Sequence, residues 1–289
     1  MLEMRRIMVV APRILMIWFA SALAIGLMVA GVVAEKTARS RDAALAMPLA
    51  SVPVASGQFV EIWSDGFSVT PTSTYRFEAS EMARQISAKH ISFDGIYARA
   101  WYEFVPEAQG EMPLVILFHG AGRDGLSQID MWKDVANRYG IALLAPNSLG
   151  RTWSLADESP QFIEKLVRNM ASAHNIDMNR IFLFGHSAGA TYALYLLNRT
   201  QGPWQAAALH AGYASLKSLS PPETAKPFRQ YMGEYEQIFS VDEARHIGKS
   251  LATYGHENDL VIIPKHDHWF YIIGPQIAEE AWKWFETKS

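Results

Sequence analysis

Residues 185–189, Gly-His-Ser-Ala-Gly, constrain the fold of this chain more than any other feature. Residues 180–184 before them form a short apolar run of the kind that buried parallel strands show. After them, apolar residues recur at i, i+3, i+4 and i+7 from Ala190 onward, which is the spacing of one face of an amphipathic helix. We therefore predict that Ser187 lies in a sharp strand-to-helix turn, with glycines where the backbones come close and the hydroxyl exposed at the sheet edge.

A second glycine-rich turn supports this interpretation. A bare G-x-S-x-G pattern occurs by chance in about one chain in ten of this length, so the pattern alone would be weak evidence. Residues 119–122, His-Gly-Ala-Gly, follow another apolar run at 114–118, where a second strand would end. No Gly-Lys-Ser/Thr follows this turn, which argues against a phosphate-binding loop. The two turns together favour a functional site over a simple glycine-flanked loop.

Strand-like and helix-like segments alternate along most of the chain. Two β-rich runs between Ile91 and Val105 flank Asp94-Gly95, a strong signal for a two-residue hairpin turn. An opening antiparallel hairpin followed by such alternation predicts an α/β fold with a mostly parallel central sheet and helices on both faces. Residues 58–86 are ambiguous. The later strands are expected at 114–118, 141–145, 181–184, 206–209, 228–232 and 260–263, and the helices at 128–139, 162–174, 188–199, 241–253 and 275–287.

Composition sets the size and class of the domain. With 289 residues, 49% of them hydrophobic, the chain can build one large α/β domain, which we expect at residues 58–289. The formal net charge is −3, and no basic patch or nucleic-acid motif suggests a polyanionic partner. The absence of cysteine excludes a disulfide framework and a thiol nucleophile. We expect no cofactor and no metal.

The N-terminal residues predict a membrane-related segment. Ile14 to Ala34 carries no charge, follows three arginines and is long enough, at 21 residues, to span a bilayer. Small-residue cleavage sites end at Ala34 and Ala46. Residues 1–34 are therefore expected to be a membrane anchor or a signal peptide, with the anchor favoured, and residues 35–57 a flexible linker. The positive charge before the apolar segment predicts an extracytoplasmic domain, anchored to the membrane or secreted after cleavage.

Three motifs together give the chain a family resemblance. They are residues 119–122, residues 177–181 leading into 185–189, and residues 267–271, Asp-His-Trp-Phe-Tyr. With these motifs the chain resembles, over residues 91–285, the α/β-hydrolase esterases of the group that includes polyhydroxybutyrate depolymerase-like and feruloyl-esterase-like enzymes. The resemblance implies the α/β-hydrolase fold. It names no substrate, because this fold hosts many reactions.

A serine hydroxyl is a poor nucleophile at neutral pH, so Ser187 needs a base and a carboxylate that orients this base. In the α/β-hydrolase fold the acid and then the histidine follow the serine. His266 and His268 come after the last predicted strand, and the resemblance of residues 267–271 to the family's Asp-His-aromatic sequence favours His268. A metal site at these two histidines lacks a third clustered ligand. The other histidines after Ser187 are expected to be structural or exposed: His210, His246 and His256.

The acid is expected in the turn after the penultimate strand, residues 228–232. Related enzymes usually carry Asp at the fourth position of this turn, counted from its glycine, so the resemblance implies Glu236. Glutamate is one methylene longer than the family's aspartate but is chemically adequate. Glu234 and Asp242 remain alternatives. Asp242 also has a structural explanation, because it would lie in the first turn of a helix that begins with a capping box.

The tetrahedral intermediate of a serine reaction carries an oxyanion that needs preorganised donors. The backbone N–H of Ala188 is one candidate, and the glycine-rich turn should supply the other, from Ala121 in preference to Gly120. Four aromatic residues in or beside loops at this sheet edge could line an acyl or aromatic pocket, or could equally belong to the core: Trp153, Tyr213, Trp269 and Phe270.

These residues lead first to the hypothesis of an extracytoplasmic serine esterase that acts on a small-molecule or polymeric ester. Acyl transfer to an alcohol is a second hypothesis, and a peptidase on the same triad is a third. A non-catalytic binding protein with this fold is the fourth. The intact Ser187, with a histidine and an acid in the expected places, argues against the last of these.

Overall fold

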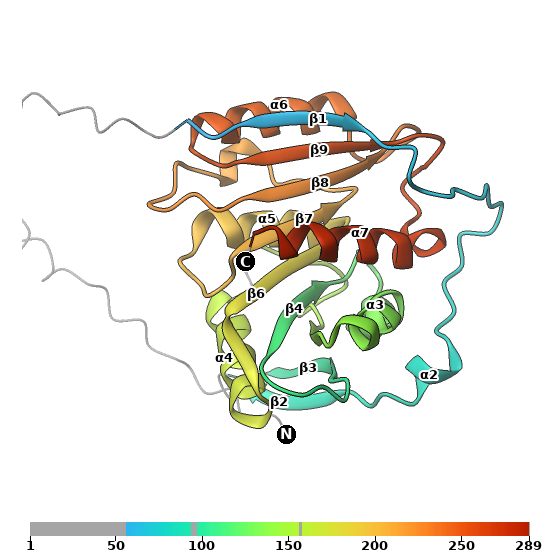
Figure 1. Ribbon diagram of the computed structural model, residues 1–289, viewed down its shortest axis with the longest axis vertical. Coiled ribbons are helices and arrows are strands. Elements are labelled where there is room, and N and C mark those ends of the chain that lie inside the picture. The colour runs from blue at the N-terminus through green and yellow to red at the C-terminus, as the bar shows by residue number, and fades with distance from the viewer. Residues whose placement is uncertain (1–55, 94–96, 156–157, 289) are drawn as a thin grey trace, which may run out of the picture. The chain divides into compact units, whose positions relative to one another are not determined.

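The computed structural model describes residues 56–93, 97–155 and 158–288 (Figure 1). The predicted anchor, residues 1–34, and nearly all of the predicted linker lie outside the described residues. No helix in the described part has the length and apolar character that crossing a membrane requires. At the start of this part the N–H of Gly57 donates to the carbonyl of Ala252 at 2.9 Å, so the folded domain includes the last residue of the predicted linker.

The described strands form one nine-stranded sheet, in the order β1-β9-β8-β7-β6-β4-β5-β3-β2. Neighbours from β1 through to β5 in this order are parallel, whereas β3 pairs antiparallel with both β5 and β2. The mostly parallel sheet and the opening antiparallel hairpin agree with the sequence prediction. The strands are β1 Phe59–Trp63, β2 Lys89–Phe93, β3 Tyr97–Phe104, β4 Met112–Phe118, β5 Ala142–Pro146, β6 Ile176–His186, β7 Ala206–His210, β8 Phe228–Gly233 and β9 Asn258–Ile263.

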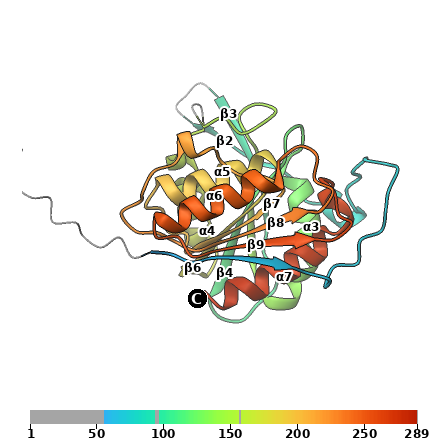
Figure 2. The same ribbon diagram turned by 90° about the horizontal axis from the view of Figure 1, so that it is seen from above.

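Helices cover both faces of this sheet. In Figure 2, α4, α5 and α6 lie on one face and α3 and α7 on the other. The side chains of β4 alternate accordingly: Leu114, Ile116 and Phe118 pack in the first core cluster, and Val115 and Leu117 pack in the second. A strand buried on both faces reads as the continuous apolar run seen here. The helices are α2 Glu81–Arg84, α3 Gly125–Tyr139, α4 Pro160–Ala173, α5 Ala188–Arg199, α6 Val241–Thr253 and α7 Gly274–Glu286, with 3₁₀ turns at Leu216–Ser218 and Phe270–Ile272.

From the hairpin of β2 and β3 onward, the observed elements follow the predicted order, and some of their bounds are shifted. Helices α5 and α6 have the predicted bounds, and β6 begins at Ile176, ahead of the predicted start at residue 181. Strand β1 lies in the ambiguous segment 58–86. It pairs in parallel with β9, where Phe59 faces Asn258, so its hydrogen-bond partners are far away in the sequence. A local pattern cannot reveal such a strand.

The parallel part of the sheet determines where the candidate site lies. The carboxyl ends of parallel strands meet at one edge, where α/β folds bind their ligands. Residues 119–122 follow β4, Ser187 follows β6, Glu236 follows β8 and His268 follows β9. The sheet therefore brings the four predicted parts of the site to the same edge.

Candidate active site

Ser187 occupies the turn between β6 and α5. Its φ of 55° and ψ of −121° lie in a region that residues with a side chain rarely adopt. A Cβ at Gly185 would lie under 3.0 Å from the backbone of Gly189, and one at Gly189 would lie under 3.0 Å from the backbone of Phe118. Only glycine fits at these two positions, which is why the strand can turn directly into the helix and expose the serine.

The Ser187 hydroxyl begins a continuous chain of hydrogen bonds. Its Oγ lies 3.0 Å from Nε2 of His268. The Nδ1 atom of the same imidazole lies 2.9 Å from each carboxylate oxygen of Glu236. Because a carboxylate only accepts, the tautomer of His268 that fits these contacts carries its proton on Nδ1, and its Nε2 accepts from the serine hydroxyl. An imidazole in this arrangement can act as a general base towards the serine.

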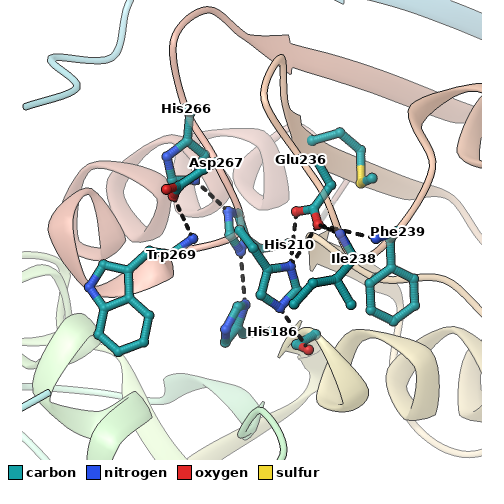
Figure 3. Close-up of polar contacts among 12 residues, drawn as sticks. His186, His210, Glu236, Ile238, Phe239, His266, Asp267 and Trp269 are labelled. Carbon is teal, nitrogen blue, oxygen red and sulfur yellow. Dashed lines mark hydrogen bonds and ion pairs between the residues drawn. The ribbon is translucent and has the colours of Figure 1, made fainter. Parts of the chain in front are cut away.

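Glu236 is held by three separate donors. Besides His268, the backbone N–H groups of Ile238 and Phe239 donate to its Oε1 at 2.7 and 3.1 Å (Figure 3). Burial by itself would raise the pKa of the Glu236 carboxyl, but the hydrogen bonds from His268 and from the two N–H groups hold this pKa below its usual value. Glu236 is therefore a carboxylate, and it can stabilise a positive charge on the imidazole.

The two alternative acids have other partners. Glu234 is exposed and accepts from the backbone N–H of Lys265 at 2.9 Å. Asp242 has a side chain that is 91% exposed and pairs with Arg245. It lies in the first turn of α6, behind a serine N-cap whose hydroxyl accepts a backbone N–H, as the sequence indicates. The carboxylate that the structure brings to His268 is that of Glu236.

The glycine-rich turn after β4 lies against the serine. A Cβ at Gly120 would lie 3.5 Å from the Cβ of Ser187 and 2.9 Å from the His186 ring. His119 holds the turn in place, because its Nε2 accepts from the N–H of Ser148 at 3.0 Å and its Nδ1 donates to the Gly120 carbonyl at 2.8 Å. Burial lowers the pKa of His119, which keeps the ring in the neutral form that this pair of bonds requires.

The predicted oxyanion donors lie on these two elements. Ala188 is the first residue of α5, and the first N–H groups of a helix have no partner within the helix. Ala121 is exposed in the glycine-rich turn, where the next residue, Gly122, donates its N–H to the carbonyl of Arg151 at 2.6 Å. Ala188 directly follows Ser187, and Ala121 follows Gly120, which lies against the serine; the role of their N–H groups as oxyanion donors stays a prediction.

Three further histidines form a buried chain behind the serine (Figure 3). His186 Nδ1 lies 2.9 Å from His210 Nδ1, and His210 Nε2 lies 2.9 Å from His266 Nε2. Burial lowers the pKa of His186 and of His210 well below the usual value, and it lowers the pKa of His266 to about 4. All three rings are therefore neutral at pH 7, and His210 donates from one nitrogen and accepts at the other. The chain connects β6, β7 and the loop after β9.

The sequence does not reveal this histidine chain, because its members are far apart in the sequence. The sequence does predict that the other two histidines after Ser187, His246 and His256, are exposed or structural. His246 is exposed on α6, and His256 is buried, with Nδ1 2.7 Å from the carbonyl of Lys226. Within the described ranges, no group of three or more His, Cys, Asp or Glu side chains has the arrangement of a metal site. Hydrogen bonding accounts for the clustering of the three buried imidazoles.

A cavity of about 300 Å³ lies beside His268. Trp269, one of the four aromatic residues predicted near a pocket, lines this cavity. Tyr75, Gln237, Ile238 and Asp267 form the rest of its wall. Its residues come from three loops: the loop between β1 and α2, the turn after β8, and the loop after β9. Tyr75 was not expected here, because it lies in the ambiguous segment of the sequence.

The pocket assignment is wrong for two of the four aromatic residues. Phe270 is fully buried and stacks on the His186 ring at a centroid distance of 5.1 Å. Trp153 is buried too, stacks on Tyr192 at 4.9 Å, and donates its Nε1–H to the carbonyl of His119 at 2.8 Å. Both belong to the core, which the sequence left open as an alternative. The fourth, Tyr213, is partly buried and packs edge-on against Phe239.

The comparisons with known proteins agree with this fold. A family model described as "Esterase PHB depolymerase" matches residues 98–221. No curated protein matches the sequence. Among solved structures, a thermostable esterase is similar with 21% identity and a TM-score of 0.58, over 72% of this chain and 64% of that one, just under two thirds of its length.

Two further solved structures are similar over a larger part of their own length. A Pyrobaculum calidifontis esterase has 16% identity and a TM-score of 0.58, covering 70% of this chain and 84% of that one. An S-formylglutathione hydrolase from Agrobacterium tumefaciens has 16% identity and a TM-score of 0.56, covering 70% of this chain and 94% of that one. At these identities the likeness shows the fold, and the α/β-hydrolase fold predicted from the sequence is confirmed.

The neutral histidine chain makes stability depend on pH. Between pH 6.5 and about 4 an unfolded chain protonates His266 while the native protein does not, so the free energy of unfolding falls as the pH falls. One full proton of difference is worth about 1.4 kcal/mol per pH unit. The substitution His266→Gln should remove up to this amount from the slope of unfolding free energy against pH between pH 6 and 5, measured by urea denaturation.

The matched control is His246→Gln, which removes an exposed imidazole from α6 and should leave the slope as it is in the parent protein. His266→Gln will also lower stability at every pH, because it breaks the bond to His210; the slope, and not the midpoint, is the readout. An unchanged slope in His266→Gln would show that His266 is charged in the native protein.

Proposed function

We propose that this chain, an α/β-hydrolase esterase of the polyhydroxybutyrate depolymerase-like group, hydrolyses carboxylic esters through an acyl-enzyme on Ser187. The observation that carries the proposal is the contact sequence of Ser187, His268 and Glu236. A nucleophile, a base in contact with it and a carboxylate that orients the base are what covalent acyl transfer requires.

In the proposed first step, Ser187 Oγ attacks the ester carbonyl carbon while its proton moves to Nε2 of His268. The carbonyl oxygen becomes an oxyanion, for which the N–H groups of Ala188 and Ala121 are the proposed donors. The carbon–oxygen bond to the alcohol then breaks, and His268 gives its proton to the departing alcohol oxygen. The acyl group remains on Ser187.

In the second step water replaces the alcohol. His268 takes a proton from water, the oxygen attacks the acyl carbon, and the bond to Ser187 Oγ breaks as the proton returns to the serine. The products are the free acid and the original enzyme. Glu236 stays ionised throughout and stabilises the imidazolium in both steps; its buried position and its lowered pKa support this role.

We also propose that the domain works outside the cytoplasm. The support is the uncharged segment from Ile14 to Ala34 with three arginines before it, since positive residues stay on the cytoplasmic side of a membrane. The segment serves as an anchor or as a cleaved signal, and both leave the catalytic domain on the same side.

The location is tested with a reporter enzyme that is active only outside the cytoplasm, fused after Ser289 of the full chain. This fusion should be active. The control fusion carries Leu23→Asp and Leu27→Asp, which place two charges in the apolar segment, and it should be inactive. A full-length fusion that is inactive while the protein accumulates in the cytoplasm would contradict the proposed location.

Ser187→Ala tests the covalent intermediate. We expect kcat for ester hydrolysis to fall by about four to six orders of magnitude, because the nucleophile is lost, while the urea midpoint stays close to that of the parent protein. Mass spectrometry after reaction with a fluorophosphonate should show one adduct on Ser187 in the parent and none in the variant. A folded Ser187→Ala enzyme with near-normal turnover would rule out the proposed mechanism.

Glu236→Gln tests the acid. An amide cannot stabilise the imidazolium and favours the wrong tautomer, so kcat should fall by about three to four orders of magnitude. Glu236→Asp should keep measurable activity if the shorter carboxylate still reaches Nδ1. The control is Asp242→Asn, an exposed acid of α6, which should keep parental activity. If Asp242→Asn or Glu234→Gln abolishes turnover and Glu236→Gln does not, the acid is misassigned.

A further inference from the structure

We propose that the 300 Å³ cavity beside His268 binds the alcohol part of the ester, and that this alcohol carries an uncharged aromatic or bulky apolar group. The inference rests on the proposed function, because it concerns the same reaction. Tyr75, Trp269 and Ile238 are the residues proposed to bind the departing alcohol. The catalytic residues alone do not identify the substrate.

The chemistry of the first step decides which part of the ester lies here. His268 must give its proton from Nε2 to the alcohol oxygen, so this oxygen lies within hydrogen-bond reach of the imidazole when the bond breaks. The group attached to that oxygen therefore extends along the His268 side of the site. His268 itself forms part of the cavity wall, so the cavity adjoins the residue that must reach the departing oxygen.

One wall of the cavity is a fixed aromatic corner. Tyr75 and Trp269 meet edge to face, with ring centroids 5.6 Å apart and an interplanar angle of 88°. Asp267 accepts a hydrogen bond from each of these residues: the Tyr75 hydroxyl donates to Oδ2 at 2.8 Å, and the backbone N–H of Trp269 donates to Oδ1 at 2.8 Å. The far side of the corner is supported by Arg123, whose guanidinium lies 5.3 Å from the Trp269 ring centroid. Such a corner offers stacking without the cost of ordering it.

Another part of the wall is an exposed isoleucine whose backbone is held by a hydrogen bond. The side chain of Ile238 is 68% exposed, and its N–H donates to Glu236 Oε1 at 2.7 Å. Tyr75, which lines the same cavity, is 56% exposed. An exposed large apolar residue needs no explanation when it stands singly, but two such residues facing one cavity that begins at the catalytic histidine indicate a binding surface.

The size and charge of the cavity narrow the class of alcohol. A volume of 300 Å³ is at the small end of ligand clefts, so it suits one ring or a short branched chain. Asp267 brings a negative charge to the wall, which disfavours a carboxylate or phosphate on the alcohol. An uncharged arylalkyl group fits these conditions.

The test compares two esters with the same acyl group, 2-phenylethyl butyrate and ethyl butyrate, on the full chain. Both release a primary alcohol, so the difference in kcat/KM reports binding of the alcohol part. The parent should prefer the phenylethyl ester by at least tenfold. Trp269→Ala should lower this preference about tenfold, Trp269→Phe should keep a part of it, and Ile238→Ala should lower it several-fold.

The matched control is Trp63→Ala, which removes an exposed tryptophan at the end of β1 and should keep the parental preference. The ratio of the two esters is the readout because any general loss of activity in Trp269→Ala cancels in it. Ile238 is exposed, so its substitution tests the cavity without disturbing the core. After the alcohol has left, both esters give the same butyryl-enzyme, and the rate of its hydrolysis should not depend on the ester used.

The reverse direction gives an independent test. By microscopic reversibility, an alcohol that attacks the butyryl-enzyme occupies the same cavity: the new carbon–oxygen bond forms, the bond to Ser187 Oγ breaks, and the alcohol proton passes through His268 to the serine. With ethyl butyrate as donor, added 2-phenylethanol should give more new ester than an equal concentration of butan-1-ol. Trp269→Ala should remove this advantage.

The outcomes separate the two proposals. If no ester is turned over and Ser187 takes no fluorophosphonate, the proposed function fails. If both esters are turned over but the parent shows no preference, or if Trp269→Ala and Ile238→Ala keep the full preference, the cavity does not bind the alcohol and this inference is wrong. A preference that falls in both variants and persists in Trp63→Ala supports it.

Discussion

The close approach of backbones around Ser187 is the constraint on which the rest of the site depends. Besides the two glycines of the turn, Gly212 after β7 has no room for a Cβ, which would lie under 3.0 Å from the Ser187 carbonyl. The N–H of Ser187 donates to the carbonyl of His210 at 2.8 Å. The ends of β4, β6 and β7 are thus in contact at Ser187. This packing maintains the strained φ of Ser187, and α5 begins directly after it.

A second set of backbone contacts joins the turn that carries Glu236 to the loop that carries His268. Gly233, the last residue of β8, lies against the carbonyl of His266, and that carbonyl accepts from the N–H of Tyr235 at 2.8 Å. The ring of His266 is held in turn by His210. The N–H of Tyr235, next to Glu236, and the carbonyl of His266, two residues before His268, therefore join the turn that carries the acid to the loop that carries the base. Neutral imidazoles suit this position, because a charged ring would need a buried counter-ion that the neighbouring histidines cannot supply.

The sequence predicts the helices and strands that have a local periodic pattern, and the site residues that the family resemblance implies. The bounds of α5 follow from a sharp start at the serine and a clear helical period. The family model that matches residues 98–221 agrees with the resemblance that the three motifs indicated. Strand β1 escapes prediction because its partner is at the other end of the chain. Trp269 and Phe270 are neighbours in the sequence, but one lines the cavity and the other is fully buried. The path of the loop decides which side chain faces the cavity, and the sequence of two adjacent aromatic residues does not predict this path.

The same loops carry catalysis and the proposed selection of substrate, yet they use different atoms for the two tasks. Ile238 supports Glu236 through its backbone N–H, and Trp269 binds Asp267 through its own. Every residue except proline supplies that donor. The side chains at these two positions can therefore change the shape of the cavity while the hydrogen bonds that hold the acid and the loop remain. A fold whose catalytic contacts depend on backbone groups in this way can accept new esters by side-chain substitution alone, which is consistent with one architecture serving many substrates.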